Sequence, residues 1–144
     1  MVANVIYRGP AEREPKTITL PIAGPYRPGI AAVISGGKFT MAAAGTGRWF
    51  ILCNNRFAGK DIYEGFILGD SVAGYRVEGE QNYNVRLAAA SYTPQQELTI
   101  GSGGVFKAAA TGNLVVAVFD EPANRTLSAE DFGDIVIISH AYLK

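Results

Sequence analysis

The sequence predicts an all-β protein: a small β-barrel, β-tulip or sandwich-like domain with an extended proline-rich N-terminal arm. Three observations predict it. Apolar residues recur at every second position, glycines separate these runs, and no long segment has a helical period. A chain of 144 residues can bury about 68–70% of its unfolded surface, so a core forms without a metal or a disulfide.

Residues 1–16 are expected to form the arm, and residues 17–144 a single β domain. Five of the seven prolines lie in the first 28 residues, and proline supplies no backbone donor to a helix or a sheet. The segment 7–16 (YRGPAEREPK) has no hydrophobic period. We therefore expect an extended segment that does not pack, and a fold that survives deletion of residues 2–16.

Three runs alternate apolar with polar side chains and predict strands with one apolar face. These runs are residues 17–22, 73–77 and 83–87. Two hairpins are predicted at residues 32–41 and 98–106. Each contains a glycine pair, which permits the positive φ angles that a tight turn requires.

Two continuous apolar runs, residues 114–119 and 135–138, are too short for ordinary helices and rich in β-branched side chains. They predict strands that are buried on both faces. At most one or two short helical turns are expected, one of them at Ser128–Phe132, where Ser128 can cap a turn. Strands at spacings of about ten residues are typical of a barrel or a sandwich.

The zero net charge conceals an asymmetry. Residues 1–60 carry eight Lys and Arg against two acids, a formal +6, and residues 61–144 carry five against eleven, a formal −6. Either the two halves neutralise each other inside one fold, or the subunit is dipolar. A dipolar subunit would pack against its neighbours in register or lay its basic arm on an acidic surface.

No catalytic residues, metal site or cofactor are expected, so the chain is predicted not to be an enzyme. The single cysteine, Cys53, excludes an internal disulfide, and the single histidine, His140, excludes a multi-histidine metal site. A Cys53–His140 nucleophile and base pair, or Glu78 and Glu80 on one strand face, are the remaining candidates. Cys53 is more typical of a small apolar residue in a strand, and the two glutamates of a solvated edge.

Neither nucleic acid nor a membrane is an expected partner. Basic and aromatic side chains interleave at Arg48, Trp49, Arg56 and Phe57, as in single-strand binders, but alternating strand faces explain them equally well. The longest run without Lys, Arg, Asp or Glu, residues 108–119, is too short to span a bilayer. The N-terminus has no basic lead and apolar stretch, so we expect folding in a cytoplasm.

Several segments resemble the capsid decoration (cement, head-stabilising) proteins of tailed bacteriophages. In the first part of the chain these are Tyr7-Arg-Gly-Pro10 and the run PGIAAVI at 28–34, which leads into SGGK at 35–38. In the second part they are YNVRLAAA at 83–90, QELTIGSGGVF at 96–106, AAATG at 108–112, VVAVF at 115–119 and LSAEDF at 127–132 before IVI at 135–137. The resemblance covers most of the chain and rests on pattern.

Members of that family are small β-barrel or β-tulip domains that sit as trimers, or as dimers in some phages, on the outside of an expanded capsid. Their N-terminal arm lies over the major capsid protein. The resemblance therefore implies assembly in the host cytoplasm, a place on the virion surface, the major capsid protein as partner, and a homotrimer. The capsid-binding residues expected in the arm are Tyr7, Arg8, Pro10, Arg13 and Lys16.

Two other functions remain open. A glycan-binding module or short head-fibre protein of the virion would use exposed aromatic side chains as its platform, namely Tyr26, Trp49, Tyr63 and Tyr92. A small β-barrel enzyme would use His140 or the two neighbouring glutamates.

Overall fold

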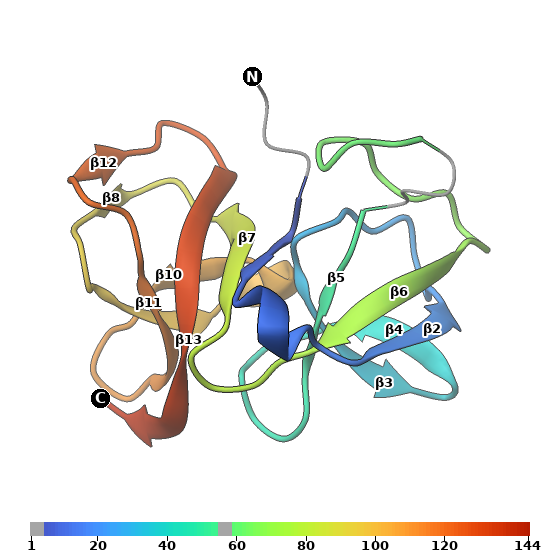
Figure 1. Ribbon diagram of the computed structural model, residues 1–144, viewed down its shortest axis with the longest axis horizontal. Helices are drawn as coiled ribbons and strands as arrows, with labels where there is room; N and C mark the ends of the chain where they lie inside the picture. Colours follow the sequence, from blue (N-terminus) through green and yellow to red (C-terminus); the bar gives the residue numbers. More distant parts are fainter. Residues whose placement is uncertain (1–4, 55–58) are drawn as a thin grey trace.

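The protein folds into two curled β-sheets that lie side by side, with almost no helix (Figure 1). The computed structural model describes residues 5–54 and 59–144. The predicted all-β fold class is confirmed. No helix in the described residues is long and apolar enough to cross a lipid bilayer.

The first sheet closes on itself. Its strands are β1 (Tyr7–Gly9), β7 (Asn82–Leu87), β9 (Glu97–Ile100), β10 (Phe106–Ala108), β11 (Leu114–Phe119) and β13 (Asp131–Leu143). The strand order is β1-β7-β10-β9-β11-β13, and β7 also pairs with β13. Since β7 has both β10 and β13 as neighbours, these five strands form a small closed ring, and β1 adds to the start of β7.

The second sheet curls in the same way. Its strands are β2 (Thr17–Pro21), β3 (Ala31–Ser35), β4 (Lys38–Met41), β5 (Phe50–Leu52) and β6 (Ser71–Arg76), in the order β2-β6-β5-β3-β4. A single bridge between Ile22 and Phe39 brings the two edges together. A short pair, β8 (Ser91–Tyr92) with β12 (Arg125–Thr126), lies apart. Two 3-10 turns, η1 (Ala11–Arg13) and η3 (Ser102–Gly104), are the helical elements of the described residues.

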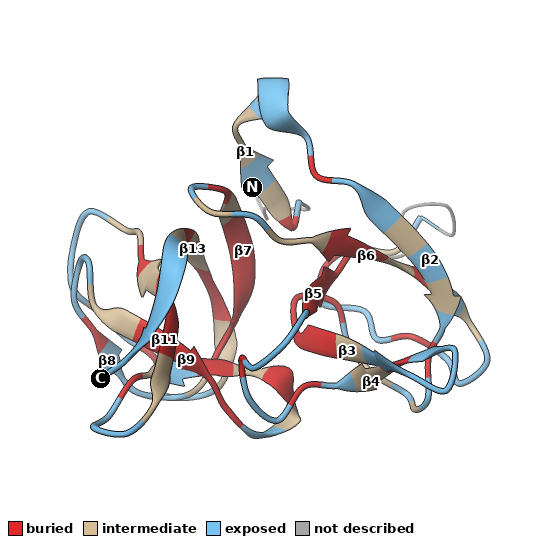
Figure 2. Ribbon diagram, turned by 90° about the horizontal axis from the view of Figure 1, so that it is seen from below, coloured by how far each residue is buried: buried red, intermediate tan, exposed pale blue. Residues whose placement is uncertain are grey.

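The core has two parts, and β5 shows why. Phe50 and Leu52 point into the second sheet's own core, whereas Ile51 points to the larger cluster, which it shares with Val85 of β7. Successive side chains of a strand alternate between the two faces of a sheet, so one strand serves both clusters. The buried segments run through the middle of both sheets, and the exposed ones lie at the rim (Figure 2). The larger cluster therefore joins the two sheets.

Both predicted hairpins are present. In β3–β4, Ser35 pairs with Lys38, and the two residues between them, Gly36 and Gly37, have φ angles of 59° and 75°. Positive φ at both central residues is the geometry of the tight turns whose twist matches that of the flanking strands. The β9–β10 hairpin turns through η3 instead. Local glycine chemistry was sufficient to predict both.

The prediction of a helical turn at Ser128–Phe132 is wrong. Residues 128–129 form a bend, and β13 begins at Asp131. Phe132 is buried and pairs with Arg86 of β7, so packing and strand pairing outweigh the weak capping signal. Burial on both faces is likewise wrong for residues 135–138, because Ile135 and Ile137 are buried while Val136 and Ile138 are partly exposed.

The N-terminal segment differs from the expected unpacked arm. Ile6 is 1% exposed and belongs to the larger cluster. Residues 7–9 form β1, which pairs antiparallel with β7, and the backbone N–H of Asn84 donates to the carbonyl of Ile6 at 2.7 Å. A three-residue strand is too short to show a period in the sequence. The segment is therefore packed, and we now expect its deletion to destabilise the fold.

Replacing Ile6 by Ala should lower the free energy of unfolding by about 2–5 kcal/mol, because the change leaves a cavity in the shared core. Val5→Ala is the matched control: Val5 is 44% exposed, and we expect its effect to stay within about 0.5 kcal/mol. Urea unfolding of the full-length variants measures both. Equal stability of the two variants would show that Ile6 does not contribute to the core.

Candidate functional site

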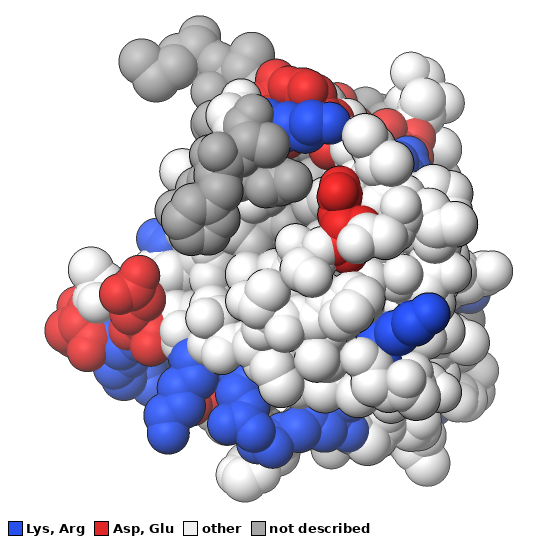
Figure 3. Space-filling view, turned by 90° about the vertical axis from the view of Figure 1, so that its right-hand side faces the viewer, with Lys and Arg blue, Asp and Glu red and all other residues white. Residues whose placement is uncertain are grey.

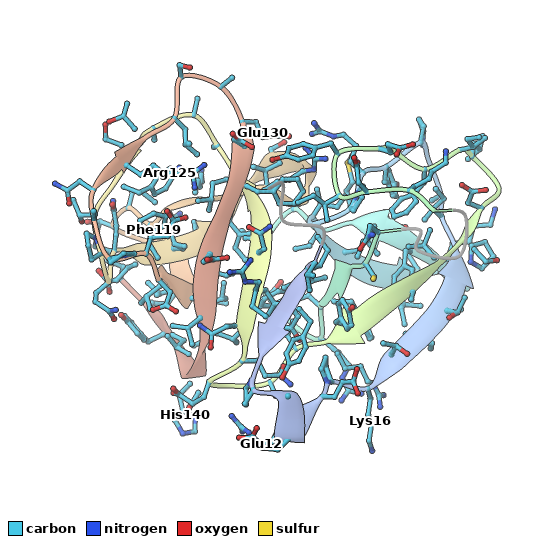
Figure 4. The ribbon with its side chains drawn as sticks, turned by 45° about the horizontal axis from the view of Figure 1, so that its top comes forward. Glu12, Lys16, Phe119, Arg125, Glu130 and His140 are labelled. Carbon is cyan, nitrogen blue, oxygen red and sulfur yellow. The ribbon has the colours of Figure 1, made fainter. Side chains whose placement is uncertain are left out.

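The N-terminal segment crosses from one sheet to the other. It begins as β1 beside β7, turns through η1, and continues as β2 beside β6. The exposed turn stands beyond both sheets in Figure 2, and Figure 4 shows the side chains of Glu12 and Lys16 directed away from the body of the protein. Three of the five predicted capsid-binding residues, Pro10, Arg13 and Lys16, therefore lie on a projecting turn that is held at both ends, and Tyr7 and Arg8 lie on the strand that leads into it.

Tyr7 supports this turn from inside. Its hydroxyl donates to the carbonyl oxygens of Pro10 and of Arg13, the latter at 3.1 Å. Its ring centre lies 6.0 Å from that of Tyr75 and 5.3 Å from that of Tyr83. Burial raises the pKa of the Tyr7 hydroxyl, which therefore stays protonated as a donor. Tyr7 and Pro10 shape the turn, so neither is a free anchor for a partner.

The Arg8 side chain already forms an ion pair within the protein. Its guanidinium lies 3.6 Å from the carboxylate of Asp134 on β13. Burial raises the pKa of the Asp134 carboxyl, and the charge of Arg8 opposes that rise. The Arg8 side chain is 40% exposed. It can contact a partner only in competition with this ion pair.

Arg13 and Lys16 keep their charges available. The carbonyl of Arg13 accepts from Gln81 Nε2 at 3.3 Å, and that of Lys16 accepts from the Arg76 N–H at 2.9 Å. Both side chains are exposed, and neither has an ion pair among the described residues. Their backbone is fixed while their charged ends reach solvent, which suits a preformed contact surface.

The charge asymmetry is partly neutralised inside the fold. Arg8 with Asp134, and Arg27 with Glu130 at 2.6 Å, join the basic first half to the acidic second half. Six acids of the second half have no ion pair among the described residues: Asp61, Glu64, Asp70, Glu78, Glu80 and Asp120. Internal neutralisation therefore accounts for part of the asymmetry and leaves charges of both signs on the surface.

Sequence reasoning missed a buried arginine. Arg86 lies on the face of residues 83–87 predicted to be polar, yet its side chain is 7% exposed. Its Nε donates to the carbonyl of Pro28 at 2.8 Å, and its Nη1 bonds Glu130 at 3.2 Å. Its guanidinium also lies 4.6 Å from the ring centre of Phe132. Burial lowers the pKa of Arg86, and Glu130 opposes this shift. The one sequence signal was an arginine in the middle of an apolar strand.

The candidates for catalysis are not brought together. Cys53 is buried, with its Sγ 3.2 Å from the hydroxyl of Tyr75, whereas His140 is exposed at the outer end of β13 (Figure 4). Glu78 and Glu80 lie in the connection between β6 and β7, with Glu80 in its turn, so they do not share a strand face. Within residues 5–54 and 59–144, no group of three or more His, Cys, Asp or Glu side chains is placed to hold a metal.

The aromatic platform proposed for glycan binding does not form from the expected side chains. Trp49 and Tyr92 are 7% and 0% exposed, and Tyr92 stacks on Phe119. Tyr26 is partly buried, and Tyr63 is 51% exposed. Of the basic and aromatic set considered for nucleic acid, Arg56 and Phe57 lie outside the described residues.

Comparison with known proteins assigns no family to the chain. No model of a protein family matches the chain, and no curated protein matches it in sequence. The fold and the surface therefore provide the physical basis for a functional proposal.

Asp134 should make stability depend on pH. Since burial raises its pKa, the folded protein binds this proton more tightly than the unfolded chain does. The resulting stabilisation is full below the unfolded pKa of about 3.9 and is lost as pH rises through the folded value. Asp134→Asn removes the titration. We expect its unfolding free energy to rise relative to the unmodified protein between about pH 3 and pH 7.

Urea unfolding at several pH values measures this difference. Asp131→Asn is a suitable control, because Asp131 is the more exposed partner of its ion pair with Arg125. A difference for Asp134→Asn that stays constant across the range would contradict the assignment.

Proposed function

We propose that the protein is a non-enzymatic structural protein that binds the outer surface of a phage capsid. In this role it stabilises the expanded shell by bridging neighbouring major capsid protein subunits. The resemblance of its sequence segments to decoration proteins supports the proposal, and so does the small all-β fold. The observation that carries it is the projecting, internally supported turn at residues 10–16.

A fixed turn suits docking because little conformational entropy is lost when it binds. The Tyr7 hydroxyl and the Gln81 amide hold the turn through its carbonyl groups. Arg13 and Lys16 then present their charges to the partner, while Tyr7 and Pro10 position them. This division of roles refines the set of five residues expected from the sequence.

Oligomerisation would strengthen shell binding. When one oligomer engages several shell subunits at once, modest affinity per site becomes strong attachment. We propose a homotrimer, with a dimer as the alternative, in which unpaired basic side chains of one subunit meet unpaired acids of the next. Contacts between unlike surfaces close most simply in a ring. Both kinds of unpaired charge are present on the described surface.

Co-sedimentation with expanded and unexpanded shells of the major capsid protein tests the proposal. We expect the protein to sediment with expanded shells, and the double variant Arg13→Gln, Lys16→Gln to bind at least about tenfold more weakly. The control, Lys38→Gln with Lys107→Gln, makes the same change of charge at other exposed positions.

Two outcomes would contradict this account. Absence of the unmodified protein from both shell pellets would reject shell binding. Equal losses in the two double variants would reject the turn as the docking site. Light scattering of the free and shell-bound protein checks the oligomer, and a monomer in both states would exclude it.

A further inference from the structure

A second group of basic side chains lies next to the turn, where β5 begins and β6 ends. A hollow of about 360 Å³ is lined by Gly47, Arg48, Trp49, Arg76 and Val77. Figure 3 shows Lys and Arg side chains gathered along the lower edge of the face that carries the second sheet. The hollow thus combines two arginines with the side chains of Trp49 and Val77.

The backbone fixes both arginines. Arg76 is the last residue of β6 and pairs with Phe50 of β5, and its N–H donates to the carbonyl of Lys16. Arg48 follows Gly47, whose φ of 70° turns the chain at this point. Trp49 is 7% exposed, and its ring packs edge-on against Phe106 at 5.8 Å between centres. The wall of the hollow is therefore set by the core.

The two guanidinium groups are not satisfied by the rest of the described chain. Neither Arg48 nor Arg76 has an ion pair there. The Nε atom of Arg76 is buried and has no hydrogen-bond acceptor. A buried donor without an acceptor is costly. A bound anion would pair with the terminal nitrogens of the Arg76 guanidinium and stabilise its charge, as Glu130 pairs with Nη1 of Arg86 elsewhere in the fold.

We propose that this hollow binds carboxylates of an acidic segment of a partner protein. Arginine matches a carboxylate through paired, parallel hydrogen bonds, and two arginines lie at this hollow. A nucleic-acid strand fits less well. A polyanion that continued from Arg76 toward Lys16 would meet Glu14, which lines the adjoining hollow together with Lys16. Separate carboxylates on a folded protein avoid that repulsion.

If the proposed function holds, the acidic segment belongs to a subunit of the capsid shell. Only this identification of the partner rests on the proposed function. The carboxylate site itself is tested without capsids. Trp49 is the single tryptophan of the chain and lines the hollow, so its fluorescence reports on binding there.

The experiment titrates the full-length protein with an acetylated and amidated peptide of sequence Gly-Glu-Gly-Gly-Glu-Gly, which carries two separate carboxylates, and follows tryptophan emission and heat. We expect saturable binding that Arg48→Gln and Arg76→Gln each weaken about tenfold, since a charge-assisted hydrogen bond is lost. Lys38→Gln, at an exposed cation of the β3–β4 turn, should bind as the unmodified protein does. Because Arg48 is exposed, its variant should fold even if the Arg76 variant does not.

Three results would overturn the inference. They are no heat or emission change with the peptide, equal affinities of Arg48→Gln and Lys38→Gln, and tighter binding of a thymidine hexanucleotide or of inorganic phosphate than of the peptide. Shell sedimentation of the unmodified protein separates the two proposals. If the peptide binds and no shell does, the carboxylate site stands and the shell function fails.

Discussion

The two sheets are joined where Arg86 is buried between them. Its guanidinium on β7 bonds the carbonyls of Pro28 and Ile62, both from segments of the second sheet's half, and the carboxylate of Glu130 before β13. A buried charge is tolerated only when its donors are paired. Beside it, the N–H of Arg86 donates to the carbonyl of Gly29 at 3.0 Å. Gly29 has a φ of 82°, and a Cβ there would lie 2.5 Å from the ring of Phe132. Close approach of the two halves thus requires both the arginine and the glycine.

The surface proposed for binding depends on that junction. The N-terminal segment is paired to β7 at one end and to β6 at the other, so the shape of its turn follows the relative position of the two sheets. The hollow beside it depends on the same positioning, because its Trp49 packs on Phe106 of the first sheet. A substitution that separates the sheets would therefore disturb both the turn and the hollow, even if it changed no residue in either. In this protein the core therefore determines the geometry of the surface.

Local signals predicted much of the fold, and tertiary effects account for the errors. Gly36 and Gly37 specify a hairpin through their own backbone preferences, and the alternation of Tyr83, Val85 and Leu87 correctly predicted the apolar face of β7. The opposite face was predicted to be polar, but the segments at Pro28 and Ile62 and the ring of Phe132 cover it, so Arg86 is buried. The strand that follows Ile6 is too short to show an alternation of apolar and polar residues in the sequence. Residue type marked the N-terminal turn as a candidate site, whereas the inward role of Tyr7 depends on Tyr75 and Tyr83, which are distant in sequence.

The central claim is that Arg86 holds the two sheets together, and the stability of Arg86→Met tests it most directly. Methionine keeps the bulk and removes the hydrogen bonds to Pro28 and Ile62, while Glu130 retains Arg27. Because the buried carbonyls of Pro28 and Ile62 are left without these donors, we predict a loss of about 2–5 kcal/mol in the free energy of urea unfolding. Arg125→Met, which removes a half-exposed arginine paired with Glu121, should cost no more than about 1 kcal/mol. An Arg86→Met variant as stable as Arg125→Met would contradict the account.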